Sequence, residues 1–451
     1  MSSDRHVGLD IGSFAVRAAE VSIEGGAPVL HRFAQLTLPP GAVVEGRVTD
    51  VTAVAATIRD LWSKGGFKAT DVVVGISTEE VKVRQAELPA LEPDELRNML
   101  RFEAQDLIPF AHADALVDFI VQARFTRDGA DMLRVLVVAA PRAHIDDAVA
   151  AASAAGLRVE GVDLVPLALV RSLCRQPEPG TGEVIVSVGA GLTSVVVAAD
   201  GVPQLVRTTA GGGGTITDAL ASRLAVGYEE AEAIKRMASR QAAEGSVATA
   251  LIDEQLGVLV REIVGSVDYF IAQTPDIDIR RIILTGSGSL VPGLRERIRA
   301  ESHLEVVPAD ALNNVALGKT QLTPEQLVAA STSLGGPIGL ALAPLAPAEA
   351  RLTALLPESY VRRVANRREA RWAGAGIAVL LLVLAGVWLH RAQSVHHAQA
   401  GVMETTRLVE SLTSKDARYT AYAAESQDLA RRTAVIKGAL GDDVDAAGLL
   451  D

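Results

Sequence analysis

The chain has 451 residues, of which 49% are hydrophobic and 22% are charged, so it is long and apolar enough to build two or more packed domains. Its net charge is −12, and its basic residues gather only in residues 362–371, which argues against nucleic acid as the main partner. The single cysteine, Cys174, excludes an internal disulfide framework, and its apolar helical surroundings indicate a buried, inert thiol rather than a nucleophile.

The N-terminal residues lead directly into a predicted β-hairpin. No apolar stretch of signal-peptide length precedes it, so we expect no secretory signal there. Residues 7–9 and 15–23 are β-compatible runs around the turn Asp10-Ile-Gly-Ser13. Backbone N–H groups in such a turn can bind phosphate oxygens, and the Asp10 carboxylate can hold a hydrated Mg²⁺. Taken alone the motif is weak, because any β-hairpin can carry Asp and Gly.

A second hairpin with the same pattern lies in residues 183–198. Its turn is Gly189-Ala-Gly191, and Thr193 follows the turn. Two such hairpins predict two duplicated halves that face one nucleotide. After the second hairpin come a glycine run in residues 211–214 and a charged helical segment in residues 229–235. A buried strand then runs into a glycine-rich turn in residues 282–293, which suits close backbone approach to a ligand.

The region between the hairpins is predicted to form a small subdomain. We expect a strand, a helix and then two strands around a turn, with the helix in residues 93–106 and the last two strands in residues 116–126 and 133–139. Alanine-rich helices in residues 143–155 and 164–173 then return to the main body and carry no catalytic residue types.

The order of these motifs resembles the actin-like ATPase superfamily. The Asp10 and Gly189 hairpins look like its phosphate loops 1 and 2, and residues 285–293 look like its adenosine motif. Residues 84–89 and 95–110 resemble the PilM family of type IV pilus assembly more closely, because the family's Glu-rich helix that ends in Ile-Pro-Phe is matched by Glu103, Ile108, Pro109 and Phe110. The resemblance implies an α/β, ribonuclease H-like duplicated ATPase fold in residues 1–345, with a 1C subdomain in residues 81–140.

The same resemblance implies that ATP and Mg²⁺ bind between the two halves, with Asp10 as the metal ligand. The family positions that contact the nucleotide correspond to Asp10, Gly12, Ser13, Arg17, Gly189, Gly191, Thr193, Gly213, Glu232, Lys235, Gly286 and Gly288. Arg17 stands where the family often has a lysine, and either cation neutralises phosphate. Ser187 stands where phosphate loop 2 usually begins with an aspartate, so we expect slow or absent hydrolysis and assign no catalytic residue.

Residues 372–389 form the longest apolar run and predict a transmembrane helix. The run has no charge, proline or amide side chain, and as a helix it would be about 27 Å long. A buried core helix would instead show a polar face at helical period. Trp372 and Trp388 lie at its two ends, and the arginines of residues 362–371 precede it. The positive-inside rule then predicts a single-pass inner-membrane protein, anchored in the bilayer with its N-terminal domain in the cytoplasm.

A segment of the predicted linker, residues 346–371, resembles the N-terminal cytoplasmic motif of PilN. It reads Leu352-Thr-Ala-Leu-Leu-Pro357, where Thr353 and Ala354 replace the usual Ile-Asn. The chain therefore resembles a PilM–PilN fusion, in which Leu352, Leu355 and Leu356 would dock between the 1A and 1C subdomains and Pro357 would fix the exit direction. The alternative is that these leucines continue a surface helix toward the membrane.

Residues 390–451 are predicted to form an extracytoplasmic tail, helical over residues 394–437. Its heptad pattern fits either a solvated helix or a weak coiled coil through which copies would self-associate. PilN proteins continue into a ferredoxin-like domain, which we do not expect in residues 438–451.

The predicted function is an ATP-binding inner-membrane scaffold of type IV pilus assembly. Its implied partners are PilO-like and PilC-like membrane proteins and the assembly ATPase. A GspL-like scaffold of type II secretion has the same architecture and is the nearest alternative. An FtsA-like division tether would attach through an amphipathic helix, and a small-molecule kinase would need the carboxylate that Ser187 replaces.

Overall fold

The computed structural model describes residues 5–108, 114–174, 180–238, 247–320, 322–347 and 350–440. The chain forms two compact units, Met1–Val364 and Ala365–Asp451. Pro109 and Phe110, which contribute to the family resemblance, lie outside the described residues, as do residues 441–451 of the predicted tail.

The first half of the body is built on a six-stranded sheet with the order β10-β6-β1-β2-β3-β16. β1, β2 and β3 form an antiparallel meander, while β6 and β10 run parallel to β1. The strands are β1 (Arg5–Ile11), β2 (Ala15–Glu24), β3 (Ala27–Thr37), β6 (Asp71–Ile76), β10 (Arg158–Leu164) and β16 (Ala316–Leu317), beside a small ribbon of β4 (Val43–Val44) and β5 (Arg47–Val48).

Four helices pack on this sheet: α1 (Val51–Gly65), α3 (Arg142–Ala154), α4 (Val165–Leu173) and α9 (Pro324–Ala341). Local sequence sets two of their starts. The Asp50 side chain accepts from Ala53 N at the start of α1, and Thr323 and Gln326 form a capping box at the start of α9. α9 can approach β1 closely because Gly8 has no side chain; a Cβ there would lie 2.1 Å from Pro337 O.

The second half repeats this arrangement in a five-stranded sheet with the order β13-β12-β11-β14-β15. β11, β12 and β13 form the antiparallel meander, and β14 runs parallel to β11 as β6 does to β1. Its strands are β11 (Thr181–Val188), β12 (Leu192–Ala199), β13 (Val202–Ala210), β14 (Asp278–Thr285) and β15 (Glu305–Pro308). The duplicated actin-like α/β fold expected from the sequence is therefore confirmed in its topology.

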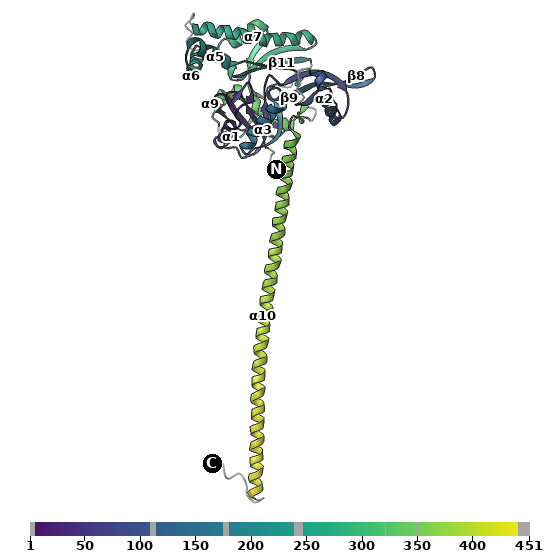
Figure 1. Cartoon of the computed structure of the whole chain (residues 1–451), viewed down its shortest axis with the longest axis vertical. Helices are drawn as coiled ribbons and strands as arrows, with labels where there is room; N and C mark the ends of the chain where they lie inside the picture. The colour runs from purple at the N-terminus through teal and green to yellow at the C-terminus, as the bar shows by residue number, and fades with distance from the viewer. Residues whose placement is uncertain are drawn as a thin grey trace. The chain divides into compact units, whose positions relative to one another are not determined.

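Helices α5 (Gly213–Leu224), α6 (Tyr228–Ala238), α7 (Val247–Gln273) and α8 (Leu294–Ser302) belong to the second half (Figure 1). The two longest of these, α7 and α5, pack on each other, and α7 also contacts β12. Among the described residues the body also has the 3₁₀ turns η1 (Ser287–Leu290), η2 (Ala311–Asn313) and η3 (Ala343–Leu345).

The predicted small subdomain is a separate three-stranded sheet with the order β7-β9-β8, packed on α2. Its elements are β7 (Lys82–Pro89), α2 (Pro93–Leu107), β8 (Ala115–Arg127) and β9 (Ala130–Pro141). Leu96 and Leu100 of α2 are buried against Phe119, Val135 and Val137 of the sheet, so this unit has a core of its own. These bounds agree closely with the predicted strands and helix.

Several elements differ from the sequence-based expectation. α1 and α7 lie in stretches for which the motifs predict no element, and β10 lies between the two predicted alanine-rich helices. The first compact unit runs to Val364, beyond the predicted end of the body at residue 345, and Leu352, Leu355 and Tyr360 pack on its core.

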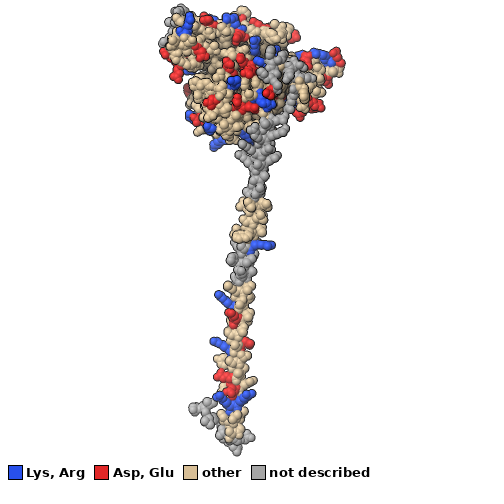
Figure 2. All heavy atoms as spheres, viewed as in Figure 1, with Lys and Arg blue, Asp and Glu red and all other residues tan. Residues whose placement is uncertain are grey.

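The last element, α10 (Glu358–Leu440), is one continuous helix through the basic segment, the apolar run and most of the tail. In the ranges that the structure describes, no helix has an apolar stretch long enough to cross a membrane. The structure describes the backbone of residues 372–379, the first part of the predicted span, but not their side chains. From residue 401 to residue 439 every side chain of the helix is exposed, and Figure 2 shows positive and negative charges interspersed along it.

Candidate functional site

The turns of the two hairpins face each other across a cavity of about 100 Å³. A Cβ atom on Gly191, in the second turn, would lie 3.0 Å from Ser13 Oγ in the first. The first turn is closed by a hydrogen bond from Gly12 N to Ala15 O and the second by one from Gly189 N to Leu192 O. Seven of the predicted site residues line this cavity: Asp10, Gly12, Ser13, Arg17, Gly189, Gly191 and Gly286.

Asp10 and Arg17 form the charged centre of the cavity. They are paired across the β1–β2 hairpin, and Arg17 Nη1 donates to Asp10 Oδ2 at 3.4 Å. Burial raises the pKa of Asp10 above its usual value, while the Arg17 guanidinium acts in the opposite direction. Arg17 Nε is buried and has no acceptor within the described part of the chain. A buried donor of this kind fits an anionic ligand in the cavity.

Ser187 and Ser194 occupy the same places in the second hairpin. They are paired across β11 and β12, as Asp10 and Arg17 are across β1 and β2. Ser187 lines the cavity, and Ser194 Oγ lies 2.9 Å from Thr208 Oγ1. The second turn therefore offers backbone groups and hydroxyls, whereas the first also offers a carboxylate and a guanidinium.

A second chamber of about 610 Å³ adjoins the first and shares Phe14, Gly189, Ala190 and Ser287 with it. This volume lies within the usual range for small-molecule sites. Four further predicted site residues line it: Gly213, Glu232, Lys235 and Gly288. The structure thus brings eleven of the twelve predicted positions to two adjoining chambers.

Lys235 is buried, and its ammonium group is bonded within the protein. Lys235 Nζ lies 2.7 Å from each of Gly213 O, Thr217 Oγ1 and Glu232 Oε2, which uses all three of its donors. Burial alone would raise the pKa of Glu232, but hydrogen bonds from Lys235 and Thr217 and the charge of Lys235 together lower it. This network ties α6 to the start of α5 and holds the glycine run beside the second turn.

Only glycine fits at two positions beside the chambers, Gly212 and Gly286. A Cβ on Gly212 would lie 2.4 Å from Gly189 O, and a Cβ on Gly286, whose φ is +85°, would lie 2.3 Å from Val188 O. The run is tied to the turn by hydrogen bonds from Gly213 N to Gly189 O and from Gly214 N to Ala190 O. These close approaches explain why the motifs are glycine-rich.

Thr193 is the predicted position that lies elsewhere. It is buried, and its Oγ1 donates to Gly211 O at 2.9 Å. Four cavity-lining residues that the motifs do not include are Ser77, Thr332, Ser333 and Gly336. A Cβ on Gly336 would lie 3.3 Å from Asp10 Oδ2. The Gly335-Gly336 pair of α9 was therefore the sequence feature that could have indicated that this helix lines the cavity.

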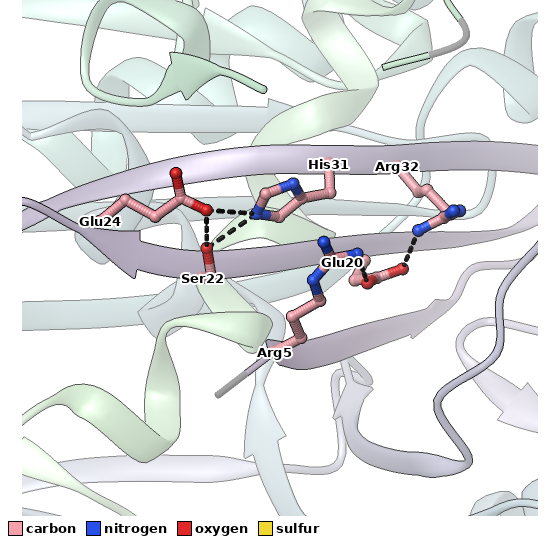
Figure 3. Close-up of polar contacts among 6 residues, drawn as sticks. All are labelled: Arg5, Glu20, Ser22, Glu24, His31 and Arg32. Carbon is pink, nitrogen blue, oxygen red and sulfur yellow. Dashed lines mark hydrogen bonds and ion pairs between the residues drawn. The ribbon is translucent and has the colours of Figure 1, made fainter. Parts of the chain in front are cut away.

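A Ser–His–Glu group on the first sheet is a second candidate for chemistry (Figure 3). Ser22 Oγ lies 2.7 Å from His31 Nε2, and Glu24 Oε1 lies 3.4 Å from the same nitrogen. A catalytic triad needs the carboxylate on the opposite ring nitrogen and an accessible hydroxyl, but Ser22 is fully buried. The group, together with Glu20 between Arg5 and Arg32, is a structural polar network.

Residues 8–344 match the family model described as type IV pilus assembly protein PilM. This chain belongs to the PilM family. A solved structure, the "PilM-PilN type IV pilus biogenesis complex", is similar with a TM-score of 0.66 and 26% identity, and the match covers 76% of this chain and 100% of that chain. The PilM match includes both hairpins, both chambers and the small subdomain, and it ends before Leu352.

Cell division protein FtsA is more distantly similar. The Bacillus subtilis protein is 20% identical over 52% of this chain, and the Streptococcus pneumoniae protein is 22% identical over 64% of it. The chain spans 58% and 72% of the lengths of these two relatives. Membership in the PilM family assigns the chain to type IV pilus assembly. It does not assign the chain to cell division or to type II secretion, the two alternatives considered from the sequence.

Proposed function

We propose that this chain is an ATP-binding membrane scaffold of type IV pilus assembly, in which a PilM-family body and a PilN-like segment belong to one polypeptide. The observation that carries the nucleotide site is the pair of facing glycine turns, of which one holds the buried Asp10 beside Arg17. The phosphates would lie between the turns, and the nucleoside would occupy the larger chamber beside Gly213 and Gly288.

The residues present fit Mg²⁺ that is carried by ATP. Within the described ranges no cluster of three or more His, Cys, Asp or Glu side chains could hold a metal ion. Mg²⁺ in nucleotide sites needs only one or two carboxylates, because phosphates and water supply its other ligands. Asp10 is the carboxylate available for that role. The phosphates would attract the Arg17 guanidinium away from Asp10, and Arg17 would then neutralise their charge.

Isothermal calorimetry of the full chain in detergent tests the nucleotide site. ATP with Mg²⁺ should bind at one site per chain. Arg17→Gln should weaken binding by about tenfold, since a charge-assisted contact to phosphate contributes on the order of 1.4 kcal/mol or more. Arg299→Gln, at an exposed position of α8, is the matched control and should bind as the wild type does. Absence of ATP binding by the wild type would refute the site.

The PilN-like segment lies against the body, which supports the docking part of the proposal. Leu355 is fully buried and Leu352 is 8% exposed, and both join the core of the first half. Thr353 N and Ala354 N both donate to Asp118 Oδ2, the second at 2.7 Å. Asp118 is a fully buried residue of β8 in the small subdomain, and Arg97 Nε donates to its other oxygen at 3.3 Å.

A further contact fixes the segment where α10 begins. Val159 N of β10 donates to Tyr360 Oη at 2.8 Å, and Tyr360 packs on the core of the first half. The segment therefore touches both the first half and the small subdomain. We infer that it is the internal counterpart of a separate PilN peptide. Because the segment is covalently tethered to the body, its effective concentration at the docking site is high, which offsets any affinity lost through the altered Thr353-Ala354 sequence.

Limited proteolysis of the full chain tests the docking. Leu355→Asp with Leu356→Asp should create a rapid cleavage site near residue 356, because a charge cannot be buried there at low cost. The body should stay folded, as judged by its protease-resistant core. Leu345→Asp is the control, since Leu345 is already 40% exposed. Rapid cleavage near Leu356 in the wild type would contradict docking.

We propose further that residues 372–389 cross the inner membrane, with the body in the cytoplasm. The support is the sequence itself, which has 18 residues without a charge after an arginine-rich segment. Carbonate extraction of membranes should leave the chain in the pellet, and release into the supernatant would contradict the proposal. Co-purification with PilO-like and PilC-like proteins and the assembly ATPase would test the proposed partners.

A further inference from the structure

A groove outside the two chambers lies where β7, β13 and α7 meet. It has a volume of about 490 Å³, and none of its lining residues lines either chamber. β7 is an edge strand of the small subdomain, and β13 is an edge strand of the second half. The two strands contact each other, so the groove runs along the junction of two sheets.

Hydrogen bonds tie one end of β13 to the connection between β6 and β7, and the other end to the small subdomain. At one end Ala210 N donates to Glu79 Oε2 at 3.2 Å. At the other end Gln122 Nε2, on β8, donates to Pro203 O at 2.8 Å. These ties hold the two walls at a set separation. The groove is therefore a feature of the folded body and not a loose gap between subdomains.

The charged residues that line the groove are mainly basic. They are Lys82 and Arg84 on the β7 side, Arg207 on β13, and one carboxylate, Glu79, which already accepts from Ala210 N. Arg84 and Arg207 are exposed, and neither has an ion-pair partner among the residues that the structure describes. Lys82 Nζ donates to Glu79 O at 2.8 Å and keeps its other donors. In a chain with a net charge of −12, this local excess of positive charge predicts a negatively charged ligand.

The shape and apolar lining favour a peptide over a small anion. Phosphate sites gather cations or backbone N–H groups around one point. Here the cations lie on two different strands, Val83 and Leu205 also line the groove, and Tyr269 of α7 in the lining is 52% exposed. Tyrosine and arginine are the residue types that most often anchor protein interfaces. An extended segment places alternate side chains on opposite faces, so one segment can meet both the cations and the apolar lining.

We propose that this groove binds an extended acidic segment of a partner protein. Its carboxylates pair with Arg84 and Arg207, and its apolar side chains contact Leu205 and Tyr269. The groove is distinct from the proposed nucleotide site, because it shares no lining residue with either chamber.

Fluorescence anisotropy with the full chain in detergent tests this site. The probe is a labelled peptide of sequence Asp-Val-Glu-Val-Asp-Val, and its counterpart has lysine in place of each acidic residue. The acidic peptide should bind, and the lysine peptide should not. Arg84→Glu with Arg207→Glu should weaken binding by about tenfold or more, because two attractions become repulsions. Tyr269→Ala should weaken it by about threefold to tenfold through lost apolar contact.

Arg299→Glu makes the same charge reversal on α8, outside the groove, and should leave binding unchanged. If the reversed pair fails to fold, Arg84→Gln with Arg207→Gln gives the same readout with a smaller change. Equal binding of the two peptides, no binding of the acidic one, or full affinity in both double variants would overturn the proposal. Displacement of the peptide by sodium phosphate but not by sodium chloride at equal ionic strength would also overturn it, because the groove would then be a small-anion site.

Discussion

The two hairpins share one backbone and differ in their charges. Each turn is closed by a hydrogen bond from its glycine N–H to the carbonyl three residues later, at Gly12 and at Gly189. The position two residues before that glycine is Asp10 in the first hairpin and Ser187 in the second. Its cross-strand partner is Arg17 in the first and Ser194 in the second.

This difference separates two tasks that a nucleotide site combines. Backbone N–H groups in glycine turns can bind phosphate oxygens whatever side chains stand nearby. Holding Mg²⁺ and directing water require a carboxylate, and only the first hairpin has one at this position. The duplicated fold therefore predicts symmetric phosphate binding by the turns, with metal chemistry confined to Asp10.

Placing a carboxylate in either turn should have the largest effect. Gly12→Asp should weaken ATP binding by about 100-fold, equivalent to roughly 2.7 kcal/mol, because it sets a negative charge against the phosphates. Gly191→Asp should cause a similar loss if the turns act alike. Calorimetry would measure both, with Gly265→Asp at an open position of α7 as the control. A loss in only one of the two variants would show that the turns do not share the phosphates.

Removing the polar side chain before each turn should separate the two hairpins. The ratio of ATP affinity with Mg²⁺ to ATP affinity with excess chelator measures the contribution of the metal. Asp10→Asn should lower this ratio by about tenfold, because it removes the only carboxylate proposed for the metal. Ser187→Ala should change the same ratio by less than about twofold. The measurement is calorimetry with Mg²⁺ and with excess chelator. Equal effects of the two substitutions would contradict the assignment of the metal to Asp10.

The first hairpin alone should make nucleotide binding sensitive to pH. Because burial raises the pKa of Asp10, its carboxylate becomes protonated at a higher pH than an ordinary aspartate. Affinity for ATP with Mg²⁺ should therefore fall as the solution is made mildly acid. Arg17→Gln removes the cation that lowers this pKa, so the fall should begin at a higher pH. Protonation also favours the folded state for such a group, so this fall should not be accompanied by unfolding. A pH-independent affinity would count against a buried Asp10 at the metal.

Restoring a carboxylate in the second hairpin should have the smallest effect. The wild type should hydrolyse ATP more slowly than about 1 per second, the lower end of the ordinary enzymatic range. Ser187→Asp should raise whatever rate exists by a few-fold, as a second carboxylate at the hydrated metal would. A phosphate-release assay measures both rates. Fast turnover by the wild type would show that hydrolysis here does not depend on a carboxylate at this position.

The sequence determined the features that depend on short stretches of chain. Both glycine turns, their flanking strands and the small subdomain follow from residue types within a few positions of one another. Eleven of the twelve positions that the family resemblance implies line the two chambers, and six of them are glycines, whose steric demands are local and visible in the motif. Thr193 is the exception, since strand alternation turned its hydroxyl toward Gly211 and away from the chambers.

Only the tertiary structure decided which distant segments meet. Thr332 and Gly336 of α9 line the cavity beside Asp10, although more than 300 positions separate them from it in the chain. The bonds from Thr353 and Ala354 to Asp118, and the groove between β7, β13 and α7, likewise depend on contacts between elements far apart in sequence. Hydrophobic periodicity and turn residues predict which face of an element is apolar. Which other element packs against that face depends on the packing of the whole body.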